Sequence, residues 1–253
     1  MLRTRVIPCL LLKDKSLVKT VKFKEYNYIG DAVNTVRIFN ELEVDELMFL
    51  DIFASKENRK INFKILQNIA NECFMPLSYG GNISSLDDAK RVFEIGFEKV
   101  VINSNAYKNL KLIEEISNYF GVQSVVGSID IKKTFFGGDN IYSHHGKKKQ
   151  KNDIVQWAKQ LESAGTGELL ITSIDNDGTW DGYDVNLIRS ITSSVQVPVI
   201  ANGGCGSLEH ITDVVKNGNA SACAVGSMVV YQKKGMGVLI NFPSRERLKK
   251  ALS

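Results

Sequence analysis

Short apolar runs alternate with amphipathic stretches along the chain, and this alternation limits the possible folds more than any other feature. In one stretch, Leu66, Ile69, Ala70 and Cys73 recur at i, i+3, i+4 and i+7, which indicates a helix. Strands alternating with helices predict an α/β protein with a parallel sheet. The predicted strands are residues 5–12, 46–52, 75–79, 99–103, 123–130, 168–174, 197–202 and 221–226.

An internal repeat indicates how these units are arranged. Gly80-Gly81 and Gly203-Gly204 are 203 − 80 = 123 positions apart, and Ser104 and Ser227 are also 227 − 104 = 123 apart. An offset of about half the chain suggests two fused copies of one unit, although chance matching of short motifs is the alternative. Eight units with this repetition predict a closed (β/α)8 barrel, a TIM barrel with a half-barrel repeat, rather than an open doubly wound sheet. We expect residues 1–253 to form this single domain.

Composition excludes several classes of protein. The chain is 43% hydrophobic and 24% charged, which is ordinary for a soluble protein with a full core. A net charge of +4 is too small to indicate nucleic-acid binding but is compatible with small anionic ligands. Cys9, Cys73, Cys205 and Cys223 have no CxxC spacing, so we expect reduced cysteines in a cytoplasmic protein. No apolar run approaches the length needed to span a membrane, and no signal peptide, metal or cofactor site is expected.

In such a barrel, functional groups gather at the carboxyl ends of the strands. Asp130 places a carboxylate near the end of the fifth predicted strand. Its counterpart in the first half of the repeat is Leu11, at 130 − 11 = 119 positions, which has no titratable group. The two halves are therefore predicted to be unequal in the chemistry they can perform.

The glycine pairs and serines after the strands predict phosphate binding. Gly80-Gly81 and Gly203-Gly204 can expose backbone N–H groups, and Ser104 and Ser227 add hydroxyl groups. The repeat then implies two phosphate sites on opposite sides of one opening, for an elongated ligand with a phosphate at each end. The alternative interpretation is that these glycines only form tight turns.

Three further features have weaker interpretations. The basic segment 144–151 is interpreted as a solvated mobile loop, in preference to a lid that closes over an anion. His210 lies in a predicted helix and is interpreted as structural. Trp180 lies in a loop, where it could cover a ligand or cap the rim of the barrel.

Motifs along essentially the whole chain resemble those of HisF, the cyclase subunit of imidazole glycerol phosphate synthase. The resemblance implies a (β/α)8 barrel with two phosphate sites and no cofactor. It also implies that ammonia arrives through the barrel from a glutaminase subunit, HisH, docked on the opposite face. The motifs are Ile7-Pro8-Cys9-Leu10, Phe49-Leu50-Asp51-Ile52, Ile102-Asn103-Ser104, Asp175-Asn176-Asp177-Gly178-Thr179 and Gly182-Tyr183-Asp184.

The resemblance implies roles for two sets of residues in this chain. The family's charged ammonia gate at the lower face of the barrel corresponds to Arg5, Glu46, Lys99 and Glu168, and Glu98 occupies an acidic position near the glutaminase dock. The predicted phosphate- and substrate-binding residues are Lys19, in a mobile loop, with Gly80, Gly81, Asn103, Ser104, Asp177, Gly178, Gly203, Gly204, Gly226 and Ser227.

The main departure from the family is Leu11, because the family uses an aspartate there together with the one matching Asp130. Loss of one positioned acid–base group costs about 10²–10⁴ in rate. Asp14 is not expected to replace it, since the family already has an aspartate at that position. Asn82 replaces a family glycine, and segment 147–151 lacks the family's Thr-Gly pair.

These departures and the tail 241–246 resemble a HisF-like subgroup that accompanies a HisH-like glutaminase and a third, sugar-amidating enzyme in surface-polysaccharide synthesis. The resemblance therefore implies ammonia delivery for acetamidino-sugar formation, with doubtful cyclase activity. Three alternatives remain. They are an ordinary cyclase of histidine biosynthesis, a non-catalytic scaffold that activates the glutaminase, and a related sugar-phosphate isomerase, which Leu11 also disfavours.

Overall fold

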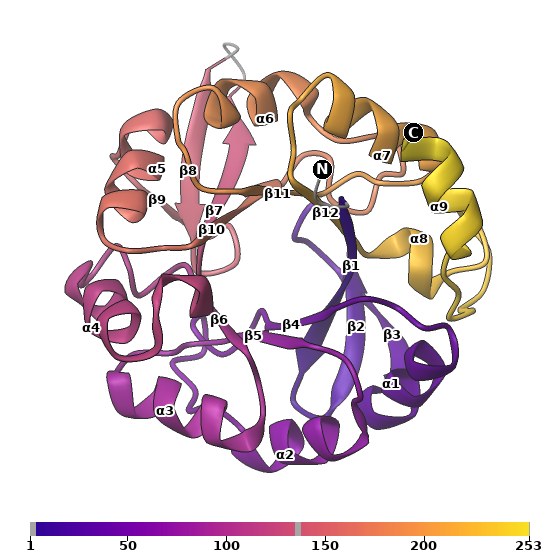
Figure 1. Ribbon diagram of the computed structural model, residues 1–253, viewed down its shortest axis with the longest axis horizontal. Helices are drawn as coiled ribbons and strands as arrows, with labels where there is room; N and C mark the ends of the chain where they lie inside the picture. Colours follow the sequence, from indigo (N-terminus) through magenta and orange to yellow (C-terminus); the bar gives the residue numbers. More distant parts are fainter. Residues whose placement is uncertain (1–3, 135–137, 253) are drawn as a thin grey trace.

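The structure is a computed structural model that describes residues 4–134 and 138–252, and it shows a closed barrel of parallel strands surrounded by helices (Figure 1). The ring closes because β7 pairs with β10 and β12 pairs with β1, both in parallel. The predicted (β/α)8 fold is therefore confirmed. In ring order the barrel strands are β1 (Arg5–Lys13), β4 (Leu47–Asp51), β5 (Leu77–Gly80), β6 (Lys99–Ile102), β7 (Val125–Lys133), β10 (Glu168–Ser173), β11 (Val199–Asn202) and β12 (Ala222–Val225).

Several of the helices begin at polar side chains that accept hydrogen bonds from free backbone N–H groups. At Ser85, for example, the hydroxyl accepts a hydrogen bond from the Asp88 N–H at 3.1 Å. None of the helices in the described ranges is long and apolar enough to cross a membrane. They are α1 (Ala32–Glu41), α2 (Phe63–Glu72), α3 (Leu86–Ile95), α4 (Lys111–Phe120), α5 (Ile154–Ser163), α6 (Val185–Thr192), α7 (Leu208–Lys216), α8 (Ser227–Val230) and α9 (Arg245–Leu252), with a 3-10 turn, η1, at Val122–Ser124.

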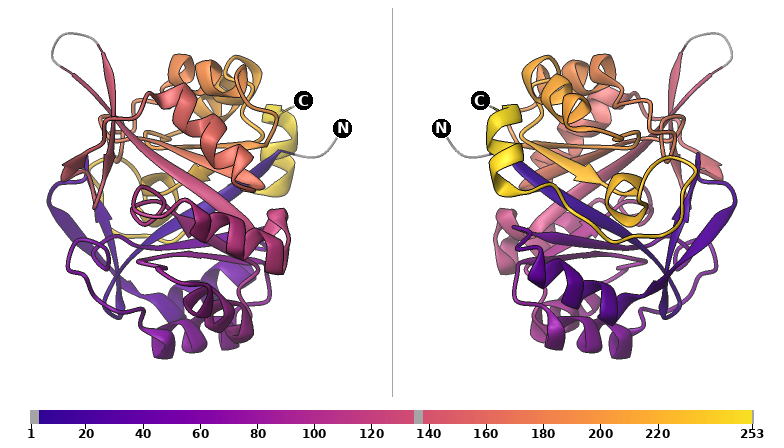
Figure 2. Two further views of the ribbon diagram at one scale, coloured as in Figure 1. Left: turned by 90° about the vertical axis from the view of Figure 1, so that its left-hand side faces the viewer. Right: turned by 90° about the vertical axis from the view of Figure 1, so that its right-hand side faces the viewer.

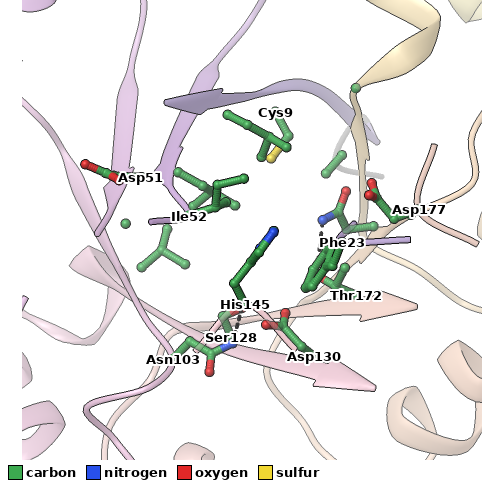
Figure 3. Close-up of a pocket in the computed structure, with 18 of the residues that line it drawn as sticks. Cys9, Phe23, Asp51, Ile52, Asn103, Ser128, Asp130, His145, Thr172 and Asp177 are labelled. Carbon is green, nitrogen blue, oxygen red and sulfur yellow. Dashed lines mark hydrogen bonds between the residues drawn. The ribbon is translucent and has the colours of Figure 1, made fainter. Parts of the chain in front are cut away.

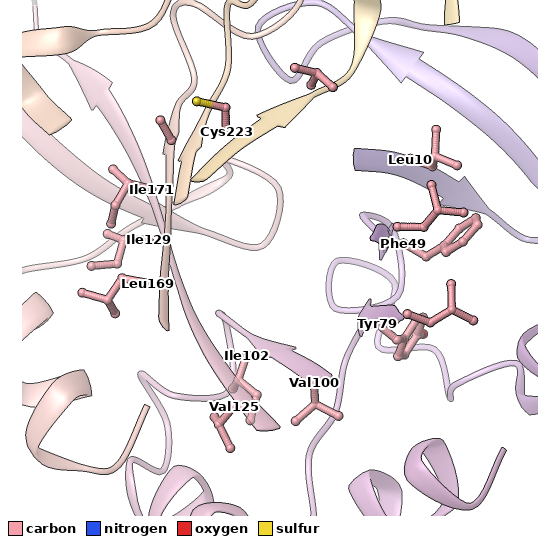
Figure 4. Close-up of a cluster of buried hydrophobic side chains, with 14 of the residues drawn as sticks. Leu10, Phe49, Tyr79, Val100, Ile102, Val125, Ile129, Leu169, Ile171 and Cys223 are labelled. Atoms are coloured by element: carbon pink, nitrogen blue, oxygen red, sulfur yellow. The ribbon is translucent and has the colours of Figure 1, made fainter. Parts of the chain in front are cut away.

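Two apolar layers hold the barrel together. The outer layer lies between the strands and the helices, and Figure 4 shows part of it, including Phe49, Val125 and Ile171. Successive side chains of a strand point to opposite faces, so the alternate residues form a second layer inside the ring. This interior cluster consists of Ile7, Cys9, Met48, Val101, Val126, Leu170, Ile200, Ala222 and Ala224.

Two antiparallel hairpins extend the barrel and were not predicted. The first, β2 (Ser16–Thr20) with β3 (Tyr26–Asp31), follows β1. The second, β8 (Asp139–Ser143) with β9 (Lys148–Lys149), follows β7. Figure 2 shows both hairpins on the side of the barrel opposite to the start of β1 and helix α9, which is the side of the carboxyl ends of the strands.

The outer layer generates a stability prediction. Ile69 on α2 is fully buried, so Ile69→Ala should lower the free energy of unfolding by about 2–5 kcal/mol. Phe74 is 87% exposed, so Phe74→Ala should change it by less than about 0.5 kcal/mol. Urea unfolding followed by circular dichroism measures both values. Equal effects of the two substitutions would contradict this description of the core.

Candidate functional site

A pocket of about 120 Å³ opens at the carboxyl ends of the barrel strands. Its floor is the interior cluster, because Cys9, Val101 and Ala224 belong both to that cluster and to the pocket lining. The residues that the sequence assigned to proton transfer and phosphate binding all line this one pocket. They are Leu11, Lys19, Gly80, Gly81, Asn103, Ser104, Asp130, Asp177, Gly178, Gly203, Gly204, Gly226 and Ser227.

The glycines and serines form two groups across the pocket. One group follows β5 and β6, and the other follows β11 and β12, which lie on the opposite side of the ring. Gly203 and Gly204 have φ of +92° and +107°, and a Cβ on Gly204 would lie 2.0 Å from the Gly182 carbonyl oxygen. A side chain is therefore excluded there, and the backbone itself forms the pocket wall, as an anion site requires.

Asp130 lies on β7 with its carboxyl group buried between polar neighbours. Burial raises its pKa to about 7; hydrogen bonding with Asn103 and Thr172 lowers it, and the Asp177 charge raises it. A carboxyl group with this pKa can both hold and release a proton near neutral pH, which is the property of a general acid or base.

Two other carboxylates line the pocket, those of Asp51 and Asp177, and each is paired with a cation of the described part of the chain. Leu11 occupies the place on β1 that is opposite β7 in the ring. Asp51 lines the pocket, but Arg59 binds both of its carboxylate oxygens, at 3.0 and 3.1 Å. Asp14 does not line the pocket; its carboxylate lies 3.8 Å from Arg59 and is 67% exposed. These positions agree with the prediction that Asp14 does not replace the missing aspartate.

Asp177 binds the first hairpin to the rim of the barrel. Its carboxylate accepts hydrogen bonds from Lys19 Nζ at 2.7 Å and from the Thr20 hydroxyl at 2.8 Å. Its carbonyl oxygen accepts a third from the Lys22 N–H at 2.8 Å. The prediction that Lys19 lies in a mobile loop is therefore wrong in this structure, because Lys19 is in β2 and only 6% exposed.

The second hairpin reaches the pocket as well. The lysines at 147–149 are exposed, but His145 lines the pocket, where it stacks on Phe23. Figure 3 shows its ring projecting among the labelled side chains between Asp51 and Asp177. The interpretation of 144–151 as a solvated loop is therefore wrong for its first residues, because basic composition alone did not reveal the turn that aims His145 inward.

The four predicted gate residues form a closed cycle of ion pairs at the opposite end of the barrel. Arg5 bridges Glu46, at 2.7 Å, and Glu168. Lys99 bridges the same two carboxylates, at 3.4 and 3.0 Å. Three of these residues are the first residues of their strands, and Glu46 directly precedes β4. Each of these buried or partly buried charges therefore has two partners of opposite sign, which offsets the cost of desolvation.

Other candidates lie outside the pocket. His210 accepts a hydrogen bond from the Gly206 N–H at 3.1 Å, in agreement with a structural role, and Trp180 is not part of the pocket lining. In residues 4–134 and 138–252 no group of three or more His, Cys, Asp or Glu side chains is placed to hold a metal ion.

The geometry defines a class of protein, the (β/α)8 barrels with an anion-type pocket at the carboxyl ends of the strands. Comparison with known proteins is more specific. The model of the family described as histidine biosynthesis protein matches residues 5–235.

The chain is also similar over nearly its whole length to proteins with related names. It is 50% identical to a protein of Pseudomonas aeruginosa provisionally named imidazole glycerol phosphate synthase subunit hisF2, covering 98% of this chain and 99% of the relative. It is 43% identical to a protein of Vibrio vulnificus provisionally named subunit hisF3, with 100% and 97% covered. It is 41% identical to imidazole glycerol phosphate synthase subunit HisF of Methanococcus vannielii, with 92% and 93% covered. The chain belongs to the HisF family.

The raised pKa of Asp130 generates a prediction about pH. Its pKa in the folded protein is about 7, above the ordinary value of 3.8, so the folded protein binds this proton more tightly than the unfolded chain. The stabilising contribution is complete below about pH 4 and is lost as the pH rises to about 7, with a slope of at most about 1.4 kcal/mol per pH unit. Asp130→Asn should lack this slope.

Urea unfolding of both proteins from pH 4 to 8 measures the difference. Asp87→Asn is the control, because the Asp87 side chain is 90% exposed. Identical pH slopes for the wild type and Asp130→Asn would show that Asp130 has an ordinary pKa.

Proposed function

We propose that this chain is a HisF-type subunit of a glutamine amidotransferase that receives ammonia from a HisH-like glutaminase and has lost most of its cyclase activity. One observation carries the proposal. The pocket holds a buried Asp130 with a pKa near 7 on one side, whereas the repeat-related position on the other side is Leu11, which cannot ionise. Cyclisation in the manner of the family needs an acid and a base, and one positioned group contributes about 10²–10⁴ in rate.

The ion-pair cycle and the interior cluster support the ammonia route. The cycle of Arg5, Glu46, Lys99 and Glu168 covers the end of the barrel at which the strands begin. Beyond it the interior is apolar as far as the pocket. An apolar passage favours neutral NH₃ over NH₄⁺, because burial of an unpaired charge is costly. We propose that ammonia enters at the cycle and leaves at the pocket.

Exposed apolar side chains support a partner on the same face. Phe74, Tyr119 and Val122 are 87%, 61% and 53% exposed. Phe74 lies between α2 and β5, whereas Tyr119 lies near the end of α4 and Val122 in the η1 turn that precedes β7. Segments that lead into parallel strands meet at one end of a barrel, so these side chains surround the end that the ion-pair cycle covers. Apolar surface of this kind is typical of a protein interface, and we assign it to the glutaminase.

For the acceptor, we propose a sugar that a third enzyme amidates, because the pocket lacks the second acid–base group. The pocket is proposed to bind a phosphorylated small molecule at its two glycine-lined sides. Cyclisation in histidine biosynthesis is the second candidate, and the relatives named HisF favour it. A scaffold that only activates the glutaminase is the third, and it differs from our proposal in passing no ammonia.

An assay with a HisH-type glutaminase, glutamine and the aminoimidazole precursor of imidazole glycerol phosphate tests the cyclase prediction. The wild type should be slower than a HisF with both aspartates by about 10²–10⁴, and Leu11→Asp should raise the rate because it restores the second group. Leu11→Asn is the control, because asparagine has nearly the shape of aspartate but cannot ionise, and it should not raise the rate. Rapid turnover by the wild type would instead establish the histidine-biosynthesis candidate.

The ammonia route generates a separate prediction for the same complex. Lys99→Ala breaks two of the four ion pairs in the cycle, so less of the ammonia should reach the acceptor and more should appear in solution. The measurement is free ammonia per glutamate formed, with Lys159→Ala on the exposed side of α5 as the control. If Lys99→Ala leaves this ratio at the wild-type value, the cycle is not the entrance.

A further inference from the structure

The two hairpin turns place their residues in an unusual backbone conformation. Lys22 and Phe23 have φ of +53° and +55°, and His144 and His145 have φ of +54° and +56°. Residues other than Gly, Asn, Asp and His are uncommon at positive φ, since Cβ is crowded there, so the strain lies mainly at Lys22 and Phe23. Such strain persists only where the surrounding structure imposes it, and it is frequent at ligand clamps.

The contact that the two turns make is a ring stack over the pocket. The centroids of the Phe23 and His145 rings are 4.8 Å apart with an interplanar angle of 11°. Phe53, from the segment after β4, lies 5.6 Å from the His145 ring. The imidazole therefore has aromatic neighbours from two other segments and a fixed orientation.

One polar atom of this ring is left without a partner. Nε2 of His145 is buried and makes no hydrogen bond to any described residue. A buried polar atom without a partner is unfavourable, so its presence in a pocket indicates a ligand that supplies the partner.

The charges around His145 indicate the sign of that ligand. Burial lowers the pKa of His145 to about 4; the charges of Lys56, Lys147 and Lys19 lower it as well, whereas Asp177 raises it. Lys19 is already paired with Asp177. The ring is therefore neutral at pH 7, in surroundings with an excess of positive charge that attracts an anion.

The second hairpin is also attached to one of the two glycine-lined sides of the pocket. The His144 N–H donates to the Ser104 hydroxyl at 3.0 Å, and Ser104 directly follows Asn103 at the end of β6. This hydrogen bond leaves the hydroxyl proton of Ser104 free to donate, so Ser104 and His145 can contact the same ligand.

We propose that His145 is a binding residue for the anion held on the β6 side of the pocket, a phosphate ester, which it contacts through Nε2. Phe23 is the positioning residue that orients its ring. The inference rests on the phosphorylated ligand of the proposed function. It adds that His145, and not the exposed lysines at 147–149, contacts that ligand from the second hairpin. Both hairpins contribute to the contact, because Phe23 lies in the turn of the first and His145 in the turn of the second.

Histidine NMR on the full chain with inorganic phosphate as the probe tests this directly, since the chain has only 3 histidines. Phosphate should raise the pKa of His145 by about one unit, because a nearby anion favours the imidazolium form. The signal of His210 should not change, since His210 lies outside the pocket lining.

Substitutions separate the two roles. His145→Phe keeps a ring that can stack on Phe23 and removes Nε2, so it should weaken phosphate binding by about tenfold or more. Phe23→Leu keeps Nε2 and should weaken binding less, with a broadened His145 signal. His210→Gln is the control for loss of a histidine and should bind phosphate as the wild type does.

Phosphate binding by the wild type without a change at His145, or equal binding by His145→Phe, would overturn this inference and leave the proposed function intact. Absence of phosphate binding by the wild type would overturn both the inference and the phosphorylated ligand. The titration of the wild type decides the matter even if a substitution prevents folding.

Discussion

The closed ring of parallel strands is the constraint on which the rest of the structure depends. Because β7 pairs with β10 and β12 with β1, no barrel strand is left with an unpaired edge. Closure also brings the carboxyl ends of all the barrel strands around one opening, which places Asp130 and Leu11 across from each other although they belong to different halves of the chain. The pocket, the apolar interior and the ion-pair cycle are thus three successive levels of one closed cylinder.

The chemistry of the pocket follows from what lies beneath it. The apolar interior cluster keeps water from the floor of the pocket, and the resulting low polarity raises the pKa of Asp130 and of the Cys9 thiol. At the other end, the charges of Arg5 and Lys99 are neutralised by two carboxylates within the same cylinder. At the end where the strands begin, the four charges of the ion-pair cycle therefore balance one another. At the pocket end, the buried carboxyl group of Asp130 has no cationic partner of this kind among the described residues.

The sequence predicted the barrel because strands buried on both faces leave strong apolar runs, and it predicted the rim residues because they follow those runs directly. It did not predict the β2–β3 and β8–β9 hairpins, whose strands are short and whose positions depend on contacts with Asp177 and Ser104. The position of His145 in the pocket lining was missed for the same reason. Its stack on Phe23 joins segments far apart in the chain, and no local pattern records such a contact. Of the two buried positions in β8, Ile141 and Ser143, only Ile141 is apolar, so the sequence carried little signal for this strand.

The three hydrogen bonds between Asp177 and the first hairpin have a consequence for the exchange of ligands. The ammonium group of Lys19 that would neutralise an arriving phosphate is the same group that fastens β2 to the rim. In the proposed phosphate site, an entering anion would compete with the Asp177 carboxylate for this one ammonium group, so tight binding of the anion would weaken the attachment of the hairpin. At this site, binding of the anion and attachment of the hairpin would therefore place opposite demands on the Lys19 side chain.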